Sequence, residues 1–309
     1  MLAPIHFVVD QMIPIELLIA QTINGLVYAS ILFLVSSGLT MIYGIMNILN
    51  LAHGSLYMLG AYFAITIIMK LAGGSPWGYL AAFILAPTAV MAVGAAIEVG
   101  LLKPIYGKPE EYQLLLTFGL ILIFDEVVKL IWGPAYINFP NPGRFLGSIE
   151  VAGFEFPVYR LLLIALGFSV AWLLWFLLSK TTLGKKMRAA AADREIVSAL
   201  GVSVPLLFTG AFMLGSFLSG LGGVAAGPLY TASPGMGIDI IVNSFAVIVI
   251  GGMGSILGAL VGSLIVGLTR AYAIVIYPAI ELALVYLIMV IVLLVRPVGL
   301  FGKPEEVRR

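Results

Sequence analysis

The sequence predicts an all-α protein, built as a polytopic helical bundle in a membrane. Of its 309 residues, 61% are hydrophobic and only 10% are charged, and the mean hydropathy is +1.13. A soluble globular protein has about 25% charged residues, so a chain with this little charge could not cover a water-exposed surface. Several long apolar stretches, most of them near the roughly 20 residues that a spanning helix needs, agree with this class. We expect one transmembrane domain over 1–309.

Two of the apolar stretches have an unusual length. The stretches 38–70 and 239–276 are too long for one ordinary span and short for two full spans. Both are interrupted by polar, glycine-rich sequence, and Gly-Ser-Leu occurs at 54–56 and again at 262–264. Paired interruptions in the two halves of a transporter indicate broken helices near a translocation path. We therefore expect two broken or re-entrant helices in a weak internal repeat. The other apolar stretches are about 15–36, 78–102, 114–132, 160–179, 206–228 and 280–296.

The distribution of Lys and Arg predicts the orientation of the chain. The segment 181–202 is rich in basic residues, and so is the C-terminal tail with Arg296, Lys303, Arg308 and Arg309, so we expect both in the cytoplasm. The loop 133–159 carries one Arg and two Glu and is expected outside. An even number of crossings between the two basic parts requires the second long stretch to cross twice. If the first long stretch also crosses twice, the chain has about ten crossings. The alternative is eight spans, which would leave the C-terminus outside. We therefore expect about 8–10 spans.

A polar stripe interrupts the first long stretch. Its members are three or four residues apart, and on a helix this spacing places them on one face. Either these side chains hydrogen-bond across the bundle, or they form a polar lining or hinge beside the translocation path. Both interpretations require the stripe to face away from lipid. The stripe comprises Thr40, Tyr43, Asn47, Asn50 and Gly54 with His53 beside them, and the candidates for the translocation path are Tyr43, Asn47, Asn50 and His53.

Glycines repeat along the second long stretch. Gly254, Gly258 and Gly262 lie four residues apart, with small residues beside them. Such a seam allows two helix backbones to approach closely. It serves either as static packing or as a smooth surface on which helices slide when a cavity changes its access.

The basic segment 181–202 is long for a simple connector. Thr182 is expected to cap a helix over 185–200, and Gly201 is expected to end it. Four consecutive alanines with charges at their rim suit docking into the groove of a partner, although a solvated amphipathic loop at the lipid surface has the same composition. The docking candidates are Arg188, Ala189, Ala191, Ala192, Asp193 and Arg194.

The chemistry of an enzyme is missing from the sequence. The chain has no cysteine and only two histidines, His6 and His53, so we expect no metal site and no cofactor. It has no G-x-x-x-x-G-K-[ST] loop, no nucleophile elbow and no acid pair in a soluble domain, so no catalytic residue is assigned. No carboxylate falls at the middle of an expected span, where ion-coupled carriers tend to keep one. No basic stretch interleaves with aromatic residues, which argues against nucleic acid as a partner.

Four segments together resemble a known family. They are GLTMIYGIMNILNLAHGSLYMLGAY, LGKKMRAAAADREIVSALGV, AVIVIGGMGSILGALVGSLIVG and LVRPVGLFG, and they look like the LivH-type inner-membrane permease of branched-chain amino acid ABC importers. The resemblance covers nearly the whole chain, and it extends to permeases for urea and short-chain amides.

The resemblance implies a plasma membrane protein of bacteria or archaea with several partners. They are a second, related (LivM-like) permease subunit, two cytoplasmic ABC ATPases and a periplasmic substrate-binding protein. It also implies that 181–202 holds the ATPase-coupling helix. The expected function is transport of leucine, isoleucine and valine by a subunit that is not itself an enzyme. Alternatives are a urea or short-chain amide permease and, in another class, an ion-coupled carrier or channel that acts alone.

Overall fold

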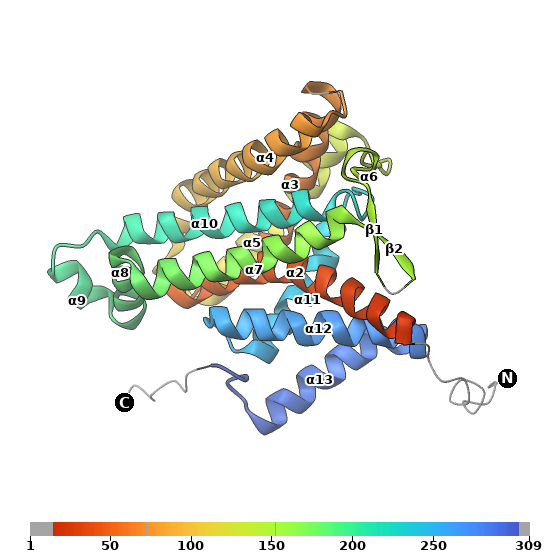
Figure 1. Cartoon of the computed structure of the whole chain (residues 1–309). Helices are drawn as coiled ribbons and strands as arrows, with labels where there is room; N and C mark the ends of the chain where they lie inside the picture. Colours follow the sequence, from red (N-terminus) through yellow and green to blue (C-terminus); the bar gives the residue numbers. More distant parts are fainter. Residues whose placement is uncertain (1–14, 72, 152, 303–309) are drawn as a thin grey trace.

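The computed structural model describes residues 15–71, 73–151 and 153–302, and shows an α-helical bundle with one short β-hairpin (Figure 1). The described residues do not include four residues named in the sequence predictions, which are His6, Lys303, Arg308 and Arg309. The helices of the first half are α2 (Ile15–Met46), α3 (His53–Thr66), η1 (Ile67–Leu71), α4 (Pro76–Ile97), η2 (Glu98–Leu102), η3 (Lys103–Ile105), α5 (Glu110–Trp132) and α6 (Gly143–Leu146). The hairpin pairs β1 (Ser148–Val151) with β2 (Phe154–Pro157) in antiparallel register. The second half contains α7 (Val158–Lys180), α8 (Thr182–Ala192), α9 (Arg194–Ala199), α10 (Val204–Ala226), α11 (Met236–Gly251), α12 (Ile256–Ile276), η4 (Pro278–Ile280) and α13 (Glu281–Val295).

Helix α2 forms the centre of the bundle. It packs against α10, α12, α7, α11 and α3, and nearly all of its apolar length is buried. Helices α7 and α13 are as apolar as α2, but most of their side chains are not fully buried. Apolar helices that are this exposed require lipid or a partner around them. In the described part of the chain, six helices are long and apolar enough to cross a membrane, and the protein is a multi-pass membrane protein. They are α2, α4 with its π and 3-10 extensions, α7, α10, α12, and η4 with α13.

The two ends of the bundle differ in character. Helices α8 and α9 project from one end, whereas α6 and the hairpin lie at the opposite end, where α2 begins (Figure 1). After α9, the chain runs through α10, α11, α12 and α13 and returns to the α8–α9 end. There Leu300 and Phe301 donate backbone hydrogen bonds of 2.9 and 2.8 Å to the carbonyls of Ile250 and Gly251. Three of these four helices are candidate spans and α11 is a shorter apolar helix, so the even number of crossings, the total of about 8–10 spans and their orientation stay predictions.

One boundary between apolar stretches was placed wrongly. The sequence suggested a division between 36 and 38, but α2 continues through this region as one helix of 32 residues. Ser37 does not interrupt it, because its hydroxyl donates to the Leu34 carbonyl, 3.0 Å away in the preceding turn. Gly38 serves packing instead: a Cβ there would lie 2.6 Å from the carbonyl oxygen of Gly215 on α10. The glycine therefore marks a helix contact and not a helix end.

Candidate functional site

The polar stripe lies where the first long stretch breaks. Helix α2 ends at Met46, residues 47–52 are not helical, and α3 begins at His53. Asn47 has a φ of +57°, in the left-handed region that Asn tolerates better than most residues. The prediction that the stripe occupies one helix face was therefore wrong. Its members are divided among the end of α2 (Thr40, Tyr43), the connecting segment (Asn47, Asn50) and the start of α3 (His53, Gly54).

Helix α3 begins deep inside the bundle. His53 Nε2 lies 3.0 Å from the carbonyl oxygen of Val35 on α2, and Ser219 of α10 donates its hydroxyl to the His53 carbonyl at 2.8 Å. Val35 precedes the end of α2 at Met46 by about 16 Å, taking 1.5 Å of rise per residue. The segment 47–52 therefore runs back along α2, and the first turn of α3 lies at the level of the middle of that helix.

Several polar groups near this turn have no partner. Asn50 is 1% exposed, and neither its amide nitrogen nor its amide oxygen has a hydrogen bond. A buried polar group without a partner costs about 1–3 kcal/mol, so a group of them needs an explanation. The N-terminus of α3 adds a partial positive charge to the same region. Further unpartnered atoms on α2, α3 and α11 are Ser36 Oγ, Thr40 Oγ1, His53 Nδ1, Asn243 Oδ1 and Ser244 Oγ, and Tyr62 Oη lies farther along α3, beside Trp132 of α5.

Helix α11 covers both sides of the break. Leu39 of α2 packs with Ile241 and Ile248 of α11, and a Cβ on Gly54 of α3 would collide with the Gly237 carbonyl group at the start of α11. The unpartnered groups on α2, on α11 and at the first turn of α3 therefore belong to one interhelical region. Buried amides, hydroxyls and an imidazole can hold a small polar molecule by hydrogen bonds.

The repeated glycines lie at a second break, in residues 252–255 between α11 and α12. A Cβ on Gly44 of α2 would lie 2.9 Å from the Cα of Gly254. A Cβ on Gly258 would lie 2.7 Å from the carbonyl carbon of Gly251, and Gly262 faces the Val247 carbonyl in the same way. Ser255 caps α12, since its Oγ accepts the Gly258 N–H at 3.0 Å. This geometry places α11 and α12 in backbone contact and joins their break to the end of α2.

The basic segment forms two helices and not the single helix expected. The cap is Thr181, whose hydroxyl accepts the Gly184 N–H at 3.1 Å, and not Thr182. Asp193 ends α8 and caps α9, because its carboxylate accepts the N–H groups of Glu195 and Ile196 at 2.9 and 3.0 Å. Gly201 follows α9 with a φ of +79°, as a terminating glycine does.

The docking candidates divide into exposed residues and residues with structural contacts. Arg188, Ala189, Ala191 and Ala192 are exposed, whereas Ala190 is buried. Asp193 is used as a cap. Arg194 donates to the Met46 carbonyl at 2.7 Å, and its guanidinium lies 5.0 Å from the ring centre of Phe208. Arg194 thus connects α9 to the last residue of α2, directly before the break.

Two features at this end of the molecule were not predicted from the sequence. Ile196 and Leu200 are 60% and 76% exposed, and their i,i+4 spacing in a charged segment was the available signal. Glu98, which lies near the end of the apolar stretch 78–102, is fully buried in the π-helix η2. It accepts the hydroxyl of Thr209 at 2.6 Å and that of Tyr106. Burial, and then the bond to Glu98, hold the pKa of Tyr106 above its usual value.

No group of three or more His, Cys, Asp or Glu that could hold a metal ion occurs within 15–71, 73–151 and 153–302.

A family model described as "Branched-chain amino acid transport system / permease component" matches residues 21–293. The chain is 30% identical over 294 residues to the high-affinity branched-chain amino acid transport system permease protein BraD of Pseudomonas aeruginosa, covering 92% of this chain and 96% of that protein.

Two further relatives have similar coverage. LivH of Escherichia coli K12, a high-affinity branched-chain amino acid transport system permease protein, is 29% identical over 92% of this chain and 96% of its own length. A probable branched-chain amino acid transport permease protein LivH of Methanocaldococcus jannaschii is 28% identical, with coverages of 90% and 91%. No solved structure matches the chain significantly.

Proposed function

The chain belongs to the family of branched-chain amino acid transport system permease components, and we propose that it carries leucine, isoleucine and valine across the plasma membrane as the permease subunit of an ABC importer. The observation that carries this proposal is the match over residues 21–293, which includes both breaks and the segment between them. A urea or short-chain amide permease is the alternative within the same class of transporter.

The energy for transport comes from other subunits. The sequence has no phosphate-binding loop, so two ATPases bind and hydrolyse ATP on the cytoplasmic side. A periplasmic binding protein delivers the substrate, and a second, LivM-like permease subunit completes the membrane part. The docking surface for an ATPase is the exposed part of α8 and α9. It combines the small side chains Ala189 and Ala191 with the exposed apolar Ile196 and Leu200, which need a cover in water.

The translocation path passes the break between α2 and α3. Tyr43, Asn47, Asn50 and His53 are its candidate residues, of which Asn50 has the strongest support. A side chain that only joins helices would have a hydrogen bond to a neighbouring helix, as His53 has to Val35. Asn50 has none, although it is buried. The unbonded amide of Asn50 can form a hydrogen bond with a polar substrate that passes it.

Uptake into liposomes tests the proposed function. The complete importer is reconstituted with ATP inside the liposomes and the binding protein outside, and initial uptake of labelled leucine, urea and acetamide is compared. We expect uptake of leucine alone, and only with ATP. Uptake of urea or acetamide in place of leucine would assign the chain to the alternative. Leucine uptake by this chain without nucleotide would show a carrier that acts alone.

ATP hydrolysis by the same liposomes tests the docking surface. Ile196→Asp places a charge in the apolar contact, so substrate-stimulated ATP hydrolysis should be lost although the protein still inserts into the membrane. Lys103→Ala, a change at an exposed residue of η3 outside α8 and α9, is the control and should retain stimulation. Normal stimulation in the Ile196→Asp variant would show that α9 is not the docking element.

A further inference from the structure

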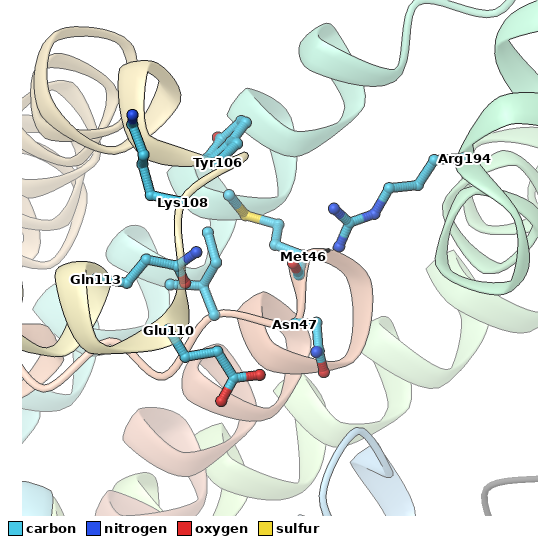
Figure 2. Close-up of a pocket in the computed structure, with 8 residues that line it drawn as sticks. Met46, Asn47, Tyr106, Lys108, Glu110, Gln113 and Arg194 are labelled. Carbon is cyan, nitrogen blue, oxygen red and sulfur yellow. Dashed lines mark hydrogen bonds between the residues drawn. The ribbon is translucent and has the colours of Figure 1, made fainter. Parts of the chain in front are cut away.

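A small pocket lies at the end of α2 that faces α9. It has a volume of ≈ 160 Å³ and is enclosed by the end of α2, the chain between η3 and α5, and α9 (Figure 2). A single water needs roughly 10–15 Å³ of such space, and drug-sized ligands occupy about 300 Å³ or more. The pocket therefore suits a molecule larger than water and smaller than a nucleotide.

Charged and polar groups enter this pocket from two sides. Glu110 and Gln113 lie one turn apart at the start of α5 and point toward the end of α2, whereas Arg194 approaches from the opposite side (Figure 2). Gln113 is only 7% exposed, and its side chain has no hydrogen bond within the described residues. Glu110 forms no ion pair with any residue that the structure describes. Lys108 also lines the pocket, but its ammonium group points away from Arg194 (Figure 2).

The arrangement has separate places for a negative and a positive group. Arg194 uses one N–H for the Met46 carbonyl and keeps others for a ligand. A guanidinium and the amide of Gln113 suit a carboxylate. On the other side, the carboxylate of Glu110 and the amide oxygen of Asn47 suit an ammonium group, which the negative C-terminal end of α2 also favours. A pocket for a simple anion would have no use for Glu110.

We propose that this pocket binds the α-carboxylate and α-ammonium groups of a free amino acid on the cytoplasmic side and that its occupancy slows transport. This inference rests on the proposed function for the class of substrate and the orientation. Arg194 joins α9, the docking element, to the last residue before the break. A bound carboxylate fixes the guanidinium in this position and so holds α9 against the end of α2. Amino acid that accumulates in the cell thereby reduces its own import.

Uptake against a preloaded lumen tests this proposal. Initial leucine uptake by the reconstituted importer is measured at increasing leucine concentrations inside the liposomes. We expect the wild type to slow as luminal leucine rises. Glu110→Gln and Gln113→Leu should each raise the half-inhibiting concentration about tenfold, which corresponds to 1.4 kcal/mol. Glu111→Gln is the matched control, because Glu111 lies in the same turn outside the pocket and should leave inhibition unchanged.

The result separates this proposal from the proposed function. Uptake into liposomes without luminal amino acid should be equal in all variants, because neither Glu110 nor Gln113 lies at the break. No leucine uptake by the wild type would overturn the proposed function. Two results would overturn the proposed pocket and leave the proposed function intact. One is uptake that does not change with the luminal leucine concentration, and the other is inhibition that is the same in wild type and both pocket variants.

Analogues in the lumen identify the groups that the pocket recognises. Leucinamide lacks the carboxylate and 4-methylpentanoate lacks the ammonium group, so neither should inhibit at the concentrations at which leucine does. Inhibition by 4-methylpentanoate as strong as that by leucine would show a site for anions, and equal inhibition by leucinamide a site for cations. Either result would contradict an amino acid site.

Discussion

The two breaks of the chain have similar sequences and different structures. Residues 47–52 return along α2 and leave the buried amide of Asn50 without a partner. Residues 252–255 form a tight connection in which Ser255 caps α12, and the C-terminal segment binds the carbonyls of Ile250 and Gly251 at the end of α11. In the second break the backbone groups that the interruption leaves are bonded. In the first break the amide of Asn50 is buried and has no hydrogen bond within the described residues, whereas Asn47 is exposed.

This difference separates two reasons for interrupting an apolar helix. Polar side chains without partners reduce stability, so their retention indicates use by a ligand. Glycines in backbone contact increase packing and need no ligand. We therefore propose that the first break belongs to the translocation path and the second to the framework that supports it. Changes in the second break should alter stability, whereas changes in the first should alter transport.

The largest effect is expected for Gly258→Leu in the framework. A Cβ there would lie 2.7 Å from the carbonyl carbon of Gly251, so α11 and α12 must separate. Overpacking typically costs 1–3 kcal/mol, and a backbone contact leaves little room to relax, so we expect at least about 3 kcal/mol. The measurement is the thermal unfolding of the purified protein. Gly119→Leu on α5, where a Cβ would meet nothing within 4 Å, is the control, and equal stability of the two variants would remove the second break from the framework.

The next effect concerns Asn50→Leu in the first break. Leucine has a similar size and no unpartnered groups, so the protein should become more stable by about 1–3 kcal/mol and lose leucine uptake. Thermal unfolding and uptake of the same preparation give both results. A less stable variant would show that the Asn50 amide is bonded, and a variant that transports normally would exclude it from the path.

A moderate effect is expected for Ser255→Ala. It removes the cap of α12, which costs about 0.5–2 kcal/mol, and should leave uptake by the remaining folded protein unchanged. Thermal unfolding measures the loss. If uptake falls and stability does not, the second break belongs to the path and the division between the breaks is wrong.

The smallest effect is expected for Asn47→Gly. Both residues accept the φ of +57°, so the stability should change by less than about 1 kcal/mol. Asn47→Val, with a branched side chain, should be clearly less stable, because this conformation is a true outlier for such residues. Thermal unfolding of the two variants tests the turn. Equal stability would show that the bend at residue 47 is not fixed in this conformation.

The sequence predicts the presence of the breaks better than their structure. Glycines and amides in an apolar stretch indicate an interruption without reference to the rest of the chain. The depth at which α3 begins depends on contacts of His53 with Val35 and Ser219, which come from different helices. The same limit applies to Arg194. The sequence predicts Arg194 as a charge at the rim of a docking helix. The carbonyl that accepts its hydrogen bond belongs to Met46, which is 148 residues away.

Labelling of a single cysteine compares the two breaks most directly, because the natural chain contains no cysteine. Asn50→Cys represents the path and Ser263→Cys, fully buried beside the glycine seam, represents the framework. Each variant is exposed to a water-soluble thiol reagent at rest and during ATP-driven transport in the assembled importer. We predict that Asn50→Cys reacts during transport and much less at rest, while Ser263→Cys reacts in neither state. An Asn50→Cys variant that transports leucine and stays as unreactive as Ser263→Cys throughout would contradict the assignment of the first break to the path.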